Sequence, residues 1–189
     1  MSEPSAETGA EQPRIVWDGH QIARALARMA HQILEANAGS ANVLLLGIPT
    51  RGVLLARRLG DAIRAAEGGE VPVGELDITM YRDDLRRQPT RAVGRTRIPR
   101  SIDNLNVVLV DDVLFSGRTV AAALDALKDL GRPRSVQLAV LVDRGLRELP
   151  IQANHVGKHL TSAADERVNV RLTEIDGQDA VTIERGGRP

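Results

Sequence analysis

The sequence predicts an α/β fold in which a mostly parallel sheet has helices on both faces. Three observations support this prediction. Apolar runs at residues 43–48, 107–110 and 135–142 have the continuous hydrophobic character of strands that are buried on both faces. Amphipathic segments alternate with these runs, as βαβ units require. Small and polar residues follow the strands, at the edge where ligands bind in such folds.

Composition narrows the class of protein. The chain has 189 residues, which fits one domain with a substantial core, although it has only one Trp, one Tyr and one Phe. The absence of cysteine excludes disulfides and thiolate metal sites. The net charge is zero, so nucleic-acid binding would need a local basic patch. No apolar run has the length of a membrane helix and no signal-peptide pattern opens the chain, so we expect a cytoplasmic protein without membrane association.

The N-terminal part is expected to contain a tail and then a helix. Residues 1–13 are polar and aperiodic, so we predict a disordered tail before a single domain over residues 14–189. Residues 20–35 have helical periodicity. The apolar face of this helix consists of Ile22, Leu26, Met29 and Ile33. The opposite face is basic, with Arg24, Arg28 and His31, and such a stripe is usually only a solvated face.

The second strand leads into a candidate anion site. Residues 43–48 are followed by Pro49-Thr50-Arg51-Gly52 and then by a helix over residues 53–66. Thr-Arg-Gly after a strand can meet an anion with backbone N–H groups and a guanidinium, but an ordinary turn has the same appearance. A third strand is expected over residues 71–79.

Residues 81–101 contain seven arginines and little apolar content. This segment cannot bury itself, so we predict a long mobile loop or an extended hairpin. A loop of this kind closes over the site in many enzymes and excludes water. The alternative is a charge-rich connection without a catalytic role.

The most informative stretch is NVVLVDDVLFSGRTVAAALDALK at residues 106–128. A buried strand is followed by Asp111 and Asp112, then by a short loop over residues 113–117, and then by a helix. The N-terminus of a helix binds phosphate through unpaired N–H groups, and the Ser116 hydroxyl would add a donor. Two adjacent carboxylates can accept hydrogen bonds from the vicinal hydroxyls of a ribose. Because strand side chains alternate, both reach one sugar only if the strand ends at the pair.

The alternative interpretation of this stretch is structural. Paired aspartates at a strand end are often only solvated, and Ser116 would then be a helix N-cap.

Further along the chain, residues 135–142 predict another buried strand, and residues 146–158 appear irregular. Two short strands at residues 168–172 and 180–184 flank Asp176-Gly177 as a closing hairpin.

VVLVDDVLFSGRT resembles the phosphoribosyl-diphosphate (PRPP) signature of type I phosphoribosyltransferases. GIPTRG, VPVGELDITMYRDD, LGRP, QLAVLVDRG and RELPI together resemble the PyrR family. This resemblance implies the type I fold, a five-stranded parallel core with a small hood and a mobile catalytic loop. It also implies that uracil and PRPP give UMP and pyrophosphate, with Mg²⁺ bound through PRPP. A second implied function is UMP-responsive binding of pyrimidine operon mRNA.

The resemblance also implies roles for individual residues. Asp111 and Asp112 match the ribose-binding pair, and Arg82 matches a PRPP contact in the catalytic loop. Thr50 and Arg51 match a diphosphate loop that often contains a non-proline cis peptide, although Pro49 replaces a common lysine. The 5′-phosphate loop corresponds to Val113, Leu114, Phe115, Ser116, Gly117, Arg118 and Thr119. Uracil is expected near Val142 and Asp143 under the hood, held partly by backbone groups.

The implied RNA-binding residues are Arg28, His31, Arg147 and Lys158. Ala27 and Leu146 depart from the family pattern, which has threonine and histidine at these positions, so we expect an RNA site that is altered in specificity or weakened. The resemblance further implies a homodimer or higher homo-oligomer. Two other functions remain open: a nucleotide-sensing RNA-binding regulator with vestigial catalysis, and a purine salvage enzyme without RNA binding.

Overall fold

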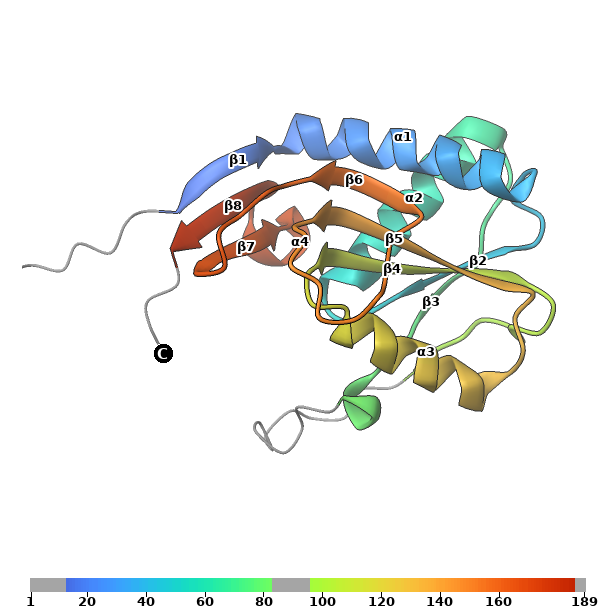
Figure 1. Ribbon diagram of the computed structural model, residues 1–189. Coiled ribbons are helices and arrows are strands. Elements are labelled where there is room, and N and C mark those ends of the chain that lie inside the picture. Colours follow the sequence, from blue (N-terminus) through green and yellow to red (C-terminus); the bar gives the residue numbers. More distant parts are fainter. Residues whose placement is uncertain (1–12, 83–95, 186–189) are drawn as a thin grey trace, which may run out of the picture.

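The computed structural model describes residues 13–82 and 96–185. These residues form two sheets and four α-helices (Figure 1). The larger sheet has five parallel strands in the order β3-β2-β4-β5-β6, which confirms the predicted parallel core. Its strands are β2 (Val43–Gly47), β3 (Val73–Glu75), β4 (Asn106–Leu114), β5 (Ser135–Asp143) and β6 (His155–His159).

Helices cover both faces of this sheet. One face carries α1 (Gly19–Asn37) and α2 (Arg51–Glu67), and the other carries α3 (Arg118–Leu130) (Figure 1). Successive strand residues alternate between the two faces, because side chains in a strand point to opposite sides. The side of α1 and α2 receives Val43, Leu45, Val108 and Val110. The side of α3 receives Leu44, Leu46, Val107 and Leu109.

This double burial explains why the strands are apolar runs without alternation. All five residues of β2 are buried, and each buried leucine contributes about 1.5–3 kcal/mol relative to exposure. The amphipathic helices need one apolar stripe only, which in α1 includes the four residues predicted from its periodicity. The α1 helix begins with a capping box, in which the Asp18 carboxylate accepts from the Gln21 N–H and the Gln21 side chain accepts from the Asp18 N–H.

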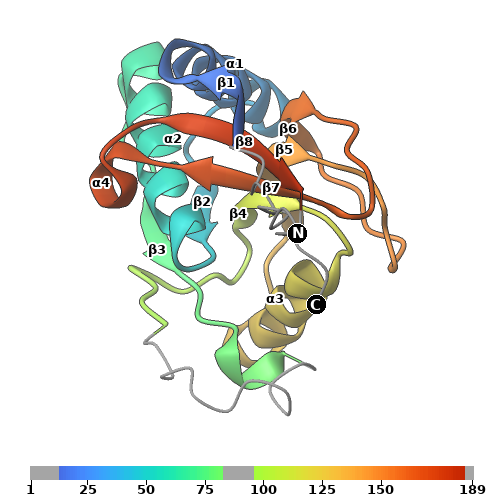
Figure 2. The same cartoon turned by 90° about the vertical axis from the view of Figure 1, so that its left-hand side faces the viewer.

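The second sheet is antiparallel and has the order β1-β8-β7. It consists of β1 (Arg14–Asp18), β7 (Glu166–Arg171) and β8 (Ala180–Arg185), and the short helix α4 (Thr173–Asp176) joins β7 to β8. This sheet and α4, hereafter the hood, lie at the end of the molecule toward which the parallel strands run (Figures 1 and 2). Hood residues such as Val170 and Ile183 share a hydrophobic core with α1.

Several predicted boundaries were wrong. The strand expected over residues 71–79 is reduced to three residues of β3, and a 3₁₀ turn follows at Thr79–Tyr81. The segment 146–158, expected to be irregular, contains the start of β6. Strand β1 was not predicted at all. The closing hairpin is confirmed, with α4 in its turn.

The arginine-rich segment lies partly outside the described residues, since residues 83–95 are not described. Near its C-terminal end, Arg97 forms an antiparallel bridge with Glu75 of β3, with N–O distances of 2.8 and 2.9 Å. The predicted tail over residues 1–12 and the end of the predicted domain, residues 186–189, are likewise outside the described part. Among the helices of the described part, none is long and apolar enough to cross a bilayer.

Candidate active site

Three adjoining cavities lie where the parallel strands end. A central cavity of about 360 Å³ adjoins one of about 250 Å³ at the start of α3, here called the phosphate-loop cavity. A third cavity of about 560 Å³ opens under the hood and is called the hood cavity. Val113 lines all three. Ligands of open α/β sheets bind at this edge, so the site lies where the fold predicts it.

The carboxylate pair borders the central cavity from β4. Both Asp111 and Asp112 line this cavity, and Asp112 also lines the hood cavity. The expectation that the strand must end at the pair was wrong, because β4 continues to Leu114. Each carboxylate accepts a hydrogen bond from the next backbone N–H, that of Asp112 at 2.9 Å and that of Val113 at 2.8 Å. The two side chains therefore border one space without a break in the strand.

The environment of Asp111 is unusual for an acid. Burial raises the pKa of Asp111 well above its ordinary value, and the charge of Asp112 raises it further. A hydrogen bond from the Asp112 N–H and the charge of Arg82 act in the opposite direction. A carboxyl with a strongly raised pKa in a cavity is typical of a ligand-binding or catalytic position.

The phosphate-loop cavity is built at the N-terminus of α3. Gly117 caps this helix with φ of 92°, a left-handed conformation that favours glycine. The Ser116 hydroxyl accepts from the Arg118 N–H at 3.3 Å. All seven predicted loop residues line this cavity: Val113, Leu114, Phe115, Ser116, Gly117, Arg118 and Thr119. Thr119 also borders the central cavity, which brings the phosphate loop next to the carboxylates.

The loop between β2 and α2 borders the central cavity from the other side. Pro49, Thr50 and Arg51 line it, and the Pro49–Thr50 peptide is cis, as the resemblance implied. Gly52 lies so close to β4 that a Cβ atom there would be 2.4 Å from the Val110 carbonyl oxygen. Only glycine permits this approach, which sets the start of α2 beside Asp111.

Arg82 lies between the central and phosphate-loop cavities and lines both, together with Asp111. Two further lining residues of the central cavity, Asp77 and Thr79, were not singled out from the sequence. The Asp77 carboxylate accepts from the hydroxyl of Thr79 at 2.6 Å and from its N–H at 3.0 Å. They were missed because the strand predicted over residues 71–79 placed both inside it, whereas β3 ends at Glu75.

The hood contributes mostly polar residues to its cavity. These are Arg167, Asn169, Arg171 and Glu184 from β7 and β8 and Asp176 from α4, and Arg51 of α2 lines the same cavity from outside the hood. None of these hood residues was predicted, because the hairpin could not be placed over the parallel strands from the sequence. Val142 and Asp143, where uracil was expected, line none of the three cavities. Val142 is instead the neighbour of Val113 across β5 and β4.

Asp143 has partners within the protein. Its carboxylate accepts from Arg147 Nη2 at 2.6 Å and from the Gly145 N–H at 2.9 Å. Burial acts to raise the pKa of Asp143, but these hydrogen bonds and the charge of Arg147 outweigh it and lower the pKa. Arg147 also donates to the carbonyl of Phe115, in the phosphate loop, at 2.9 Å.

The predicted RNA-binding residues divide into two groups. Arg28 and His31 are exposed on α1, and Arg28 donates to the Gly157 carbonyl of β6 at 2.5 Å. Lys158 follows in β6, with its ammonium 5.2 Å from the ring centre of Trp17. Arg147 is not with them, because its guanidinium binds beside the phosphate loop.

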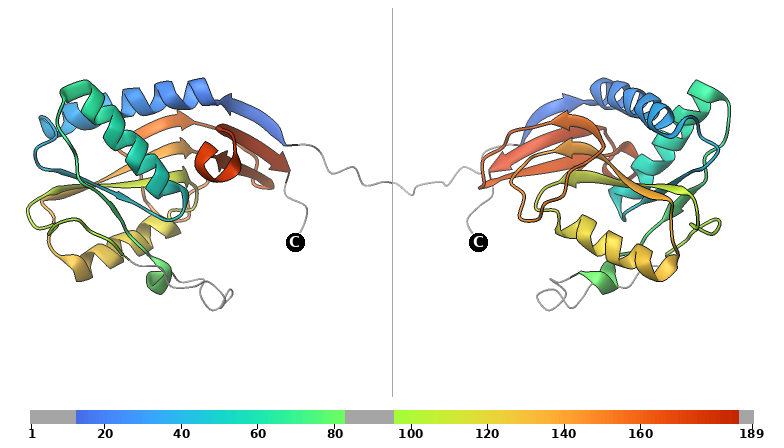
Figure 3. Two further views of the ribbon diagram at one scale, coloured as in Figure 1. Left: turned by 180° about the vertical axis from the view of Figure 1, so that it is seen from behind. Right: turned by 45° about the vertical axis from the view of Figure 1, so that its right-hand side comes forward.

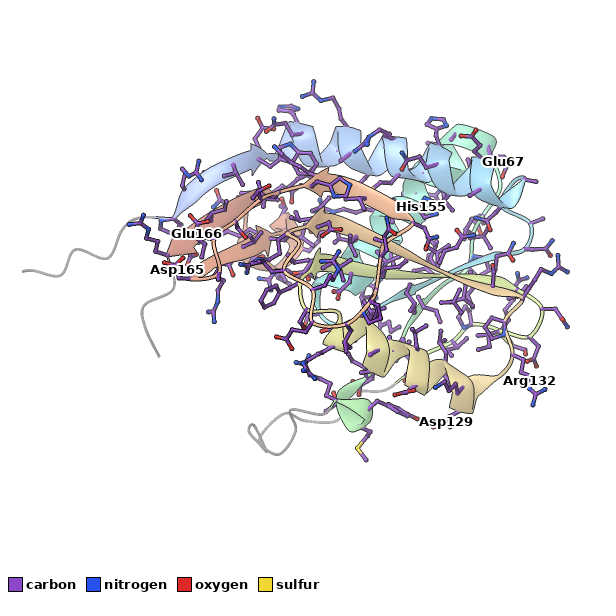
Figure 4. The ribbon with its side chains drawn as sticks, in the orientation of Figure 1. Glu67, Asp129, Arg132, His155, Asp165 and Glu166 are labelled. Carbon is purple, nitrogen blue, oxygen red and sulfur yellow. The ribbon has the colours of Figure 1, made fainter. Side chains whose placement is uncertain are left out.

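Two of the side chains labelled in Figure 4, His155 and Asp129, line none of the three cavities but have hydrogen-bond partners in neighbouring segments. His155, at the start of β6, is buried with Nε2 3.0 Å from the side-chain oxygen of Gln137, and burial lowers its pKa. Asp129, near the end of α3, accepts a hydrogen bond of 2.6 Å from the Tyr81 hydroxyl. This bond ties the 3₁₀ turn that precedes Arg82 to α3.

Comparisons with known proteins agree with this geometry. The model of the phosphoribosyl transferase domain matches residues 15–169. The bifunctional protein PyrR of Leifsonia xyli subsp. xyli is 62% identical over 179 residues, which cover 92% of this chain and 98% of that protein. The PyrR proteins of Streptomyces coelicolor and Bacillus cereus are 59% and 52% identical, and the matches cover 95% and 92% of this chain and 92% and 98% of theirs.

Solved structures of similar fold include purine enzymes. The hypoxanthine-guanine phosphoribosyltransferase of Leishmania tarentolae, in complex with GMP, has a TM-score of 0.71 at 17% identity and covers 92% of this chain and 97% of that one. The hypoxanthine phosphoribosyltransferase of Trypanosoma cruzi has a TM-score of 0.70 at 17% identity, with coverage of 94% and 98%. At this identity the likeness shows the type I fold alone. The domain match and the identities to the bifunctional proteins together show that the chain belongs to the phosphoribosyltransferase family and, within it, to the PyrR family.

Proposed function

We propose that the chain transfers the ribose 5-phosphate group of PRPP to uracil, and that it regulates pyrimidine genes by UMP-responsive RNA binding. The observation that carries the first part is the continuity of the site. A helix N-terminus for a phosphate, two carboxylates for ribose hydroxyls and a loop for a diphosphate border the same adjoining cavities. PRPP has these three groups in this order, and a nucleoside monophosphate has the same phosphate and ribose with a base in place of the diphosphate.

The proposed mechanism depends on charge. As pyrophosphate leaves, positive charge develops on the ribose, and Asp111 and Asp112 stabilise it from the side of β4. Arg51 and Arg82 stabilise the negative charge that develops on the leaving group. Of the two carboxylates we assign the greater role to Asp112, because it borders both the central cavity and the hood cavity.

The residues present suit Mg²⁺ bound through PRPP. Mg²⁺ prefers oxygen ligands and is usually held by one or two carboxylates together with substrate phosphates. Asp111 and Asp112 can supply carboxylate oxygens in the central cavity. Within residues 13–82 and 96–185, no three acidic or histidine side chains form a metal site without a substrate. When bound, the ion neutralises charge on the leaving diphosphate.

The base is proposed to lie at the junction of the hood cavity with Val113, close to the end of β5. Val142 is then the neighbour of Val113 in the adjacent strand and Asp143 that of Leu114, and the polar hood residues supply donors and acceptors for uracil. The resemblance implied that backbone groups hold part of the base, and β7, at the edge of the hood sheet, has backbone groups that could do so.

The RNA surface is proposed to follow α1 and β6. Arg28 and Lys158 lie close together because α1 packs on β6, and His31 is about one turn further along the helix. Arg28 and Lys158 would mainly contact phosphates. Arg147 lies apart from these residues, at the phosphate loop, and would contact RNA from there. Alanine at Arg28 or Lys158 should weaken RNA binding and reduce the salt slope by about one per lost contact; an unchanged slope would exclude the residue.

From the resemblance we further propose a cytoplasmic homodimer or higher homo-oligomer, which size-exclusion chromatography with light scattering can test.

The test of the enzyme function is product formation from PRPP and Mg²⁺ with uracil, hypoxanthine and guanine as separate acceptors. UMP from uracil alone is the expected result. Asp112→Asn should lower kcat by about 100-fold, whereas the surface control Asp125→Asn should not change it. Formation of a purine nucleotide would contradict the proposal, and near-normal turnover by Asp112→Asn would remove the role assigned to this carboxylate. No product with any base, with UMP still bound, would identify a sensor that has lost the chemistry.

A further inference from the structure

The hood is attached to α2 by two arginines that lie on one side of that helix. Arg51 and Arg58 are separated by about two helical turns, and both reach carboxylates of the turn between β7 and β8. Arg58 donates to Glu174 and Asp179 over distances of 2.6–2.9 Å. Arg51 Nη2 lies 2.9 and 3.1 Å from the two carboxylate oxygens of Asp176. Figure 3 shows α4 beside α2 in the view from behind.

The two arginines differ in their relation to the site. Arg51 lines the central cavity and the hood cavity, whereas Arg58 lines neither. The Nε atom of Arg51 is buried and has no hydrogen-bond partner. A buried donor without a partner is costly, and this one belongs to a side chain that borders a cavity lined by Thr50 and Asp112. Nη2 of the guanidinium is therefore held by the hood, while the side chain itself borders the two cavities in which a ligand would lie.

Asp176 is itself held in place. One of its carboxylate oxygens accepts from the Leu172 N–H at 2.8 Å, at the start of α4. Its side chain is 22% exposed and that of Arg51 is 34% exposed, so the ion pair is partly shielded from water. The carboxylate thus offers Arg51 a fixed partner that does not depend on any ligand.

We infer that Asp176 is a positioning residue, which orients Arg51 for the diphosphate of PRPP. This inference rests on the proposed function, because it assigns Arg51 to the leaving group. Ordering a free arginine on ligand binding costs conformational entropy, and a carboxylate that orders it beforehand removes part of that cost. The negative charge of Asp176 has the opposite effect, because it repels the diphosphate. The amide of Asp176→Asn can still accept from Arg51 but has no charge, so this variant separates the two effects.

The test compares Asp176→Ala and Asp176→Asn with Glu174→Ala, a control that loses an ion pair from the same helix but does not touch Arg51. Calorimetry without a base gives the Kd of Mg²⁺-PRPP, and steady-state assays give KM and kcat. Asp176→Ala should raise both Kd and the KM for PRPP about tenfold, as expected for the loss of one charge-assisted hydrogen bond, with kcat within about twofold of wild type. Asp176→Asn should restore most of the affinity. Glu174→Ala should leave it unchanged.

A double-mutant cycle excludes a purely structural role. In an Arg51→Ala background, Asp176→Ala should have no further effect on the Kd, because the residue that it positions is gone. Equal losses in Asp176→Ala and Glu174→Ala would show that the hood as a whole matters and would overturn the inference. An unchanged or lower Kd in Asp176→Ala would overturn it as well. Absence of UMP formation by wild-type protein that binds PRPP would count only against the proposed function. Binding of neither Mg²⁺-PRPP nor Mg²⁺-pyrophosphate would remove both.

Discussion

Substitution of Arg147 by alanine is expected to destabilise the protein, because this guanidinium joins three segments next to the phosphate loop. Its Nη2 donates to Asp143, its Nη1 to the Phe115 carbonyl, and its Nε to the Ile151 carbonyl at 2.8 Å. The Asp143 side chain is only 9% exposed. Removing one partner of a buried ion pair typically costs about 3–5 kcal/mol, since the other charge stays buried. For a domain of this size, that loss corresponds to a fall in Tm of about 6–20 °C.

Thermal and urea unfolding, followed by circular dichroism, measure this loss. The double variant Asp143→Asn, Arg147→Ala should be more stable than Arg147→Ala, because it has no unpaired carboxylate. The pH dependence gives a second check. In the wild type the pKa of Asp143 is lowered, so its ionised carboxylate stabilises the fold. This stabilisation is present above the unfolded pKa and is lost as pH falls through the folded pKa. In Arg147→Ala, burial without the guanidinium should raise that pKa, so the deficit should shrink as pH falls.

The result matters for the RNA proposal, because Arg147 is one of its four residues. A loss of RNA binding in Arg147→Ala would reflect a disturbed phosphate loop as well as a missing contact. The structural reasoning is refuted if the unfolding free energy of Arg147→Ala lies within about 0.5 kcal/mol of the wild-type value and the variant still loses RNA binding.

Three further predictions concern packing and charge. Gly52→Ala should lower the unfolding free energy by about 1–3 kcal/mol and weaken PRPP binding in calorimetry, because the new methyl would lie 2.4 Å from the Val110 carbonyl oxygen. An unchanged unfolding free energy and an unchanged Kd for PRPP would contradict the close approach. Asp111→Asn should raise Tm at pH 7, because a carboxyl whose folded pKa is raised destabilises the fold as pH rises above its unfolded pKa. The gain should disappear at pH values below the unfolded pKa, and no gain at pH 7 would contradict the direction of the pKa shift. Arg58→Ala should lower the unfolding free energy by about 1–3 kcal/mol at pH 7. Hydrogen bonds from Arg58 and Thr173, opposed by burial, lower the pKa of Asp179 to about 2, so this loss should diminish as pH falls from about 4 to about 2. A loss that is independent of pH would contradict this origin.

The parallel core and the phosphate loop could be predicted because their signals are local. A strand buried on both faces is apolar throughout, as in β2 and β4, and the sequence that follows β4 places acids and small residues in a fixed order. Strand β6 gives no such signal. Among the described residues it lies at the edge of the parallel sheet, beside β5, and polar residues such as His155 and Lys158 interrupt its apolar pattern.

The hood shows a second limit of sequence reasoning. Its hairpin was predicted from two short strands, but its place above the parallel strands depends on long-range contacts. Asp176 was seen only as a turn residue, and its contact with Arg51 spans more than half the chain. The continuation of β4 past Asp111 and Asp112 was missed because alternation was applied to an ideal strand, whereas both side chains hydrogen-bond to the backbone and border one cavity.

The most direct test of the account is an experimental structure of the protein with UMP. The account predicts that the 5′-phosphate lies at the N–H groups of Ser116–Thr119 and that the ribose hydroxyls bind Asp111 and Asp112. It also predicts uracil at the junction of Val113 with the hood cavity. A nucleotide bound elsewhere, or one whose ribose does not reach the carboxylate pair, would contradict the assignment of these cavities to a phosphoribosyl transfer site.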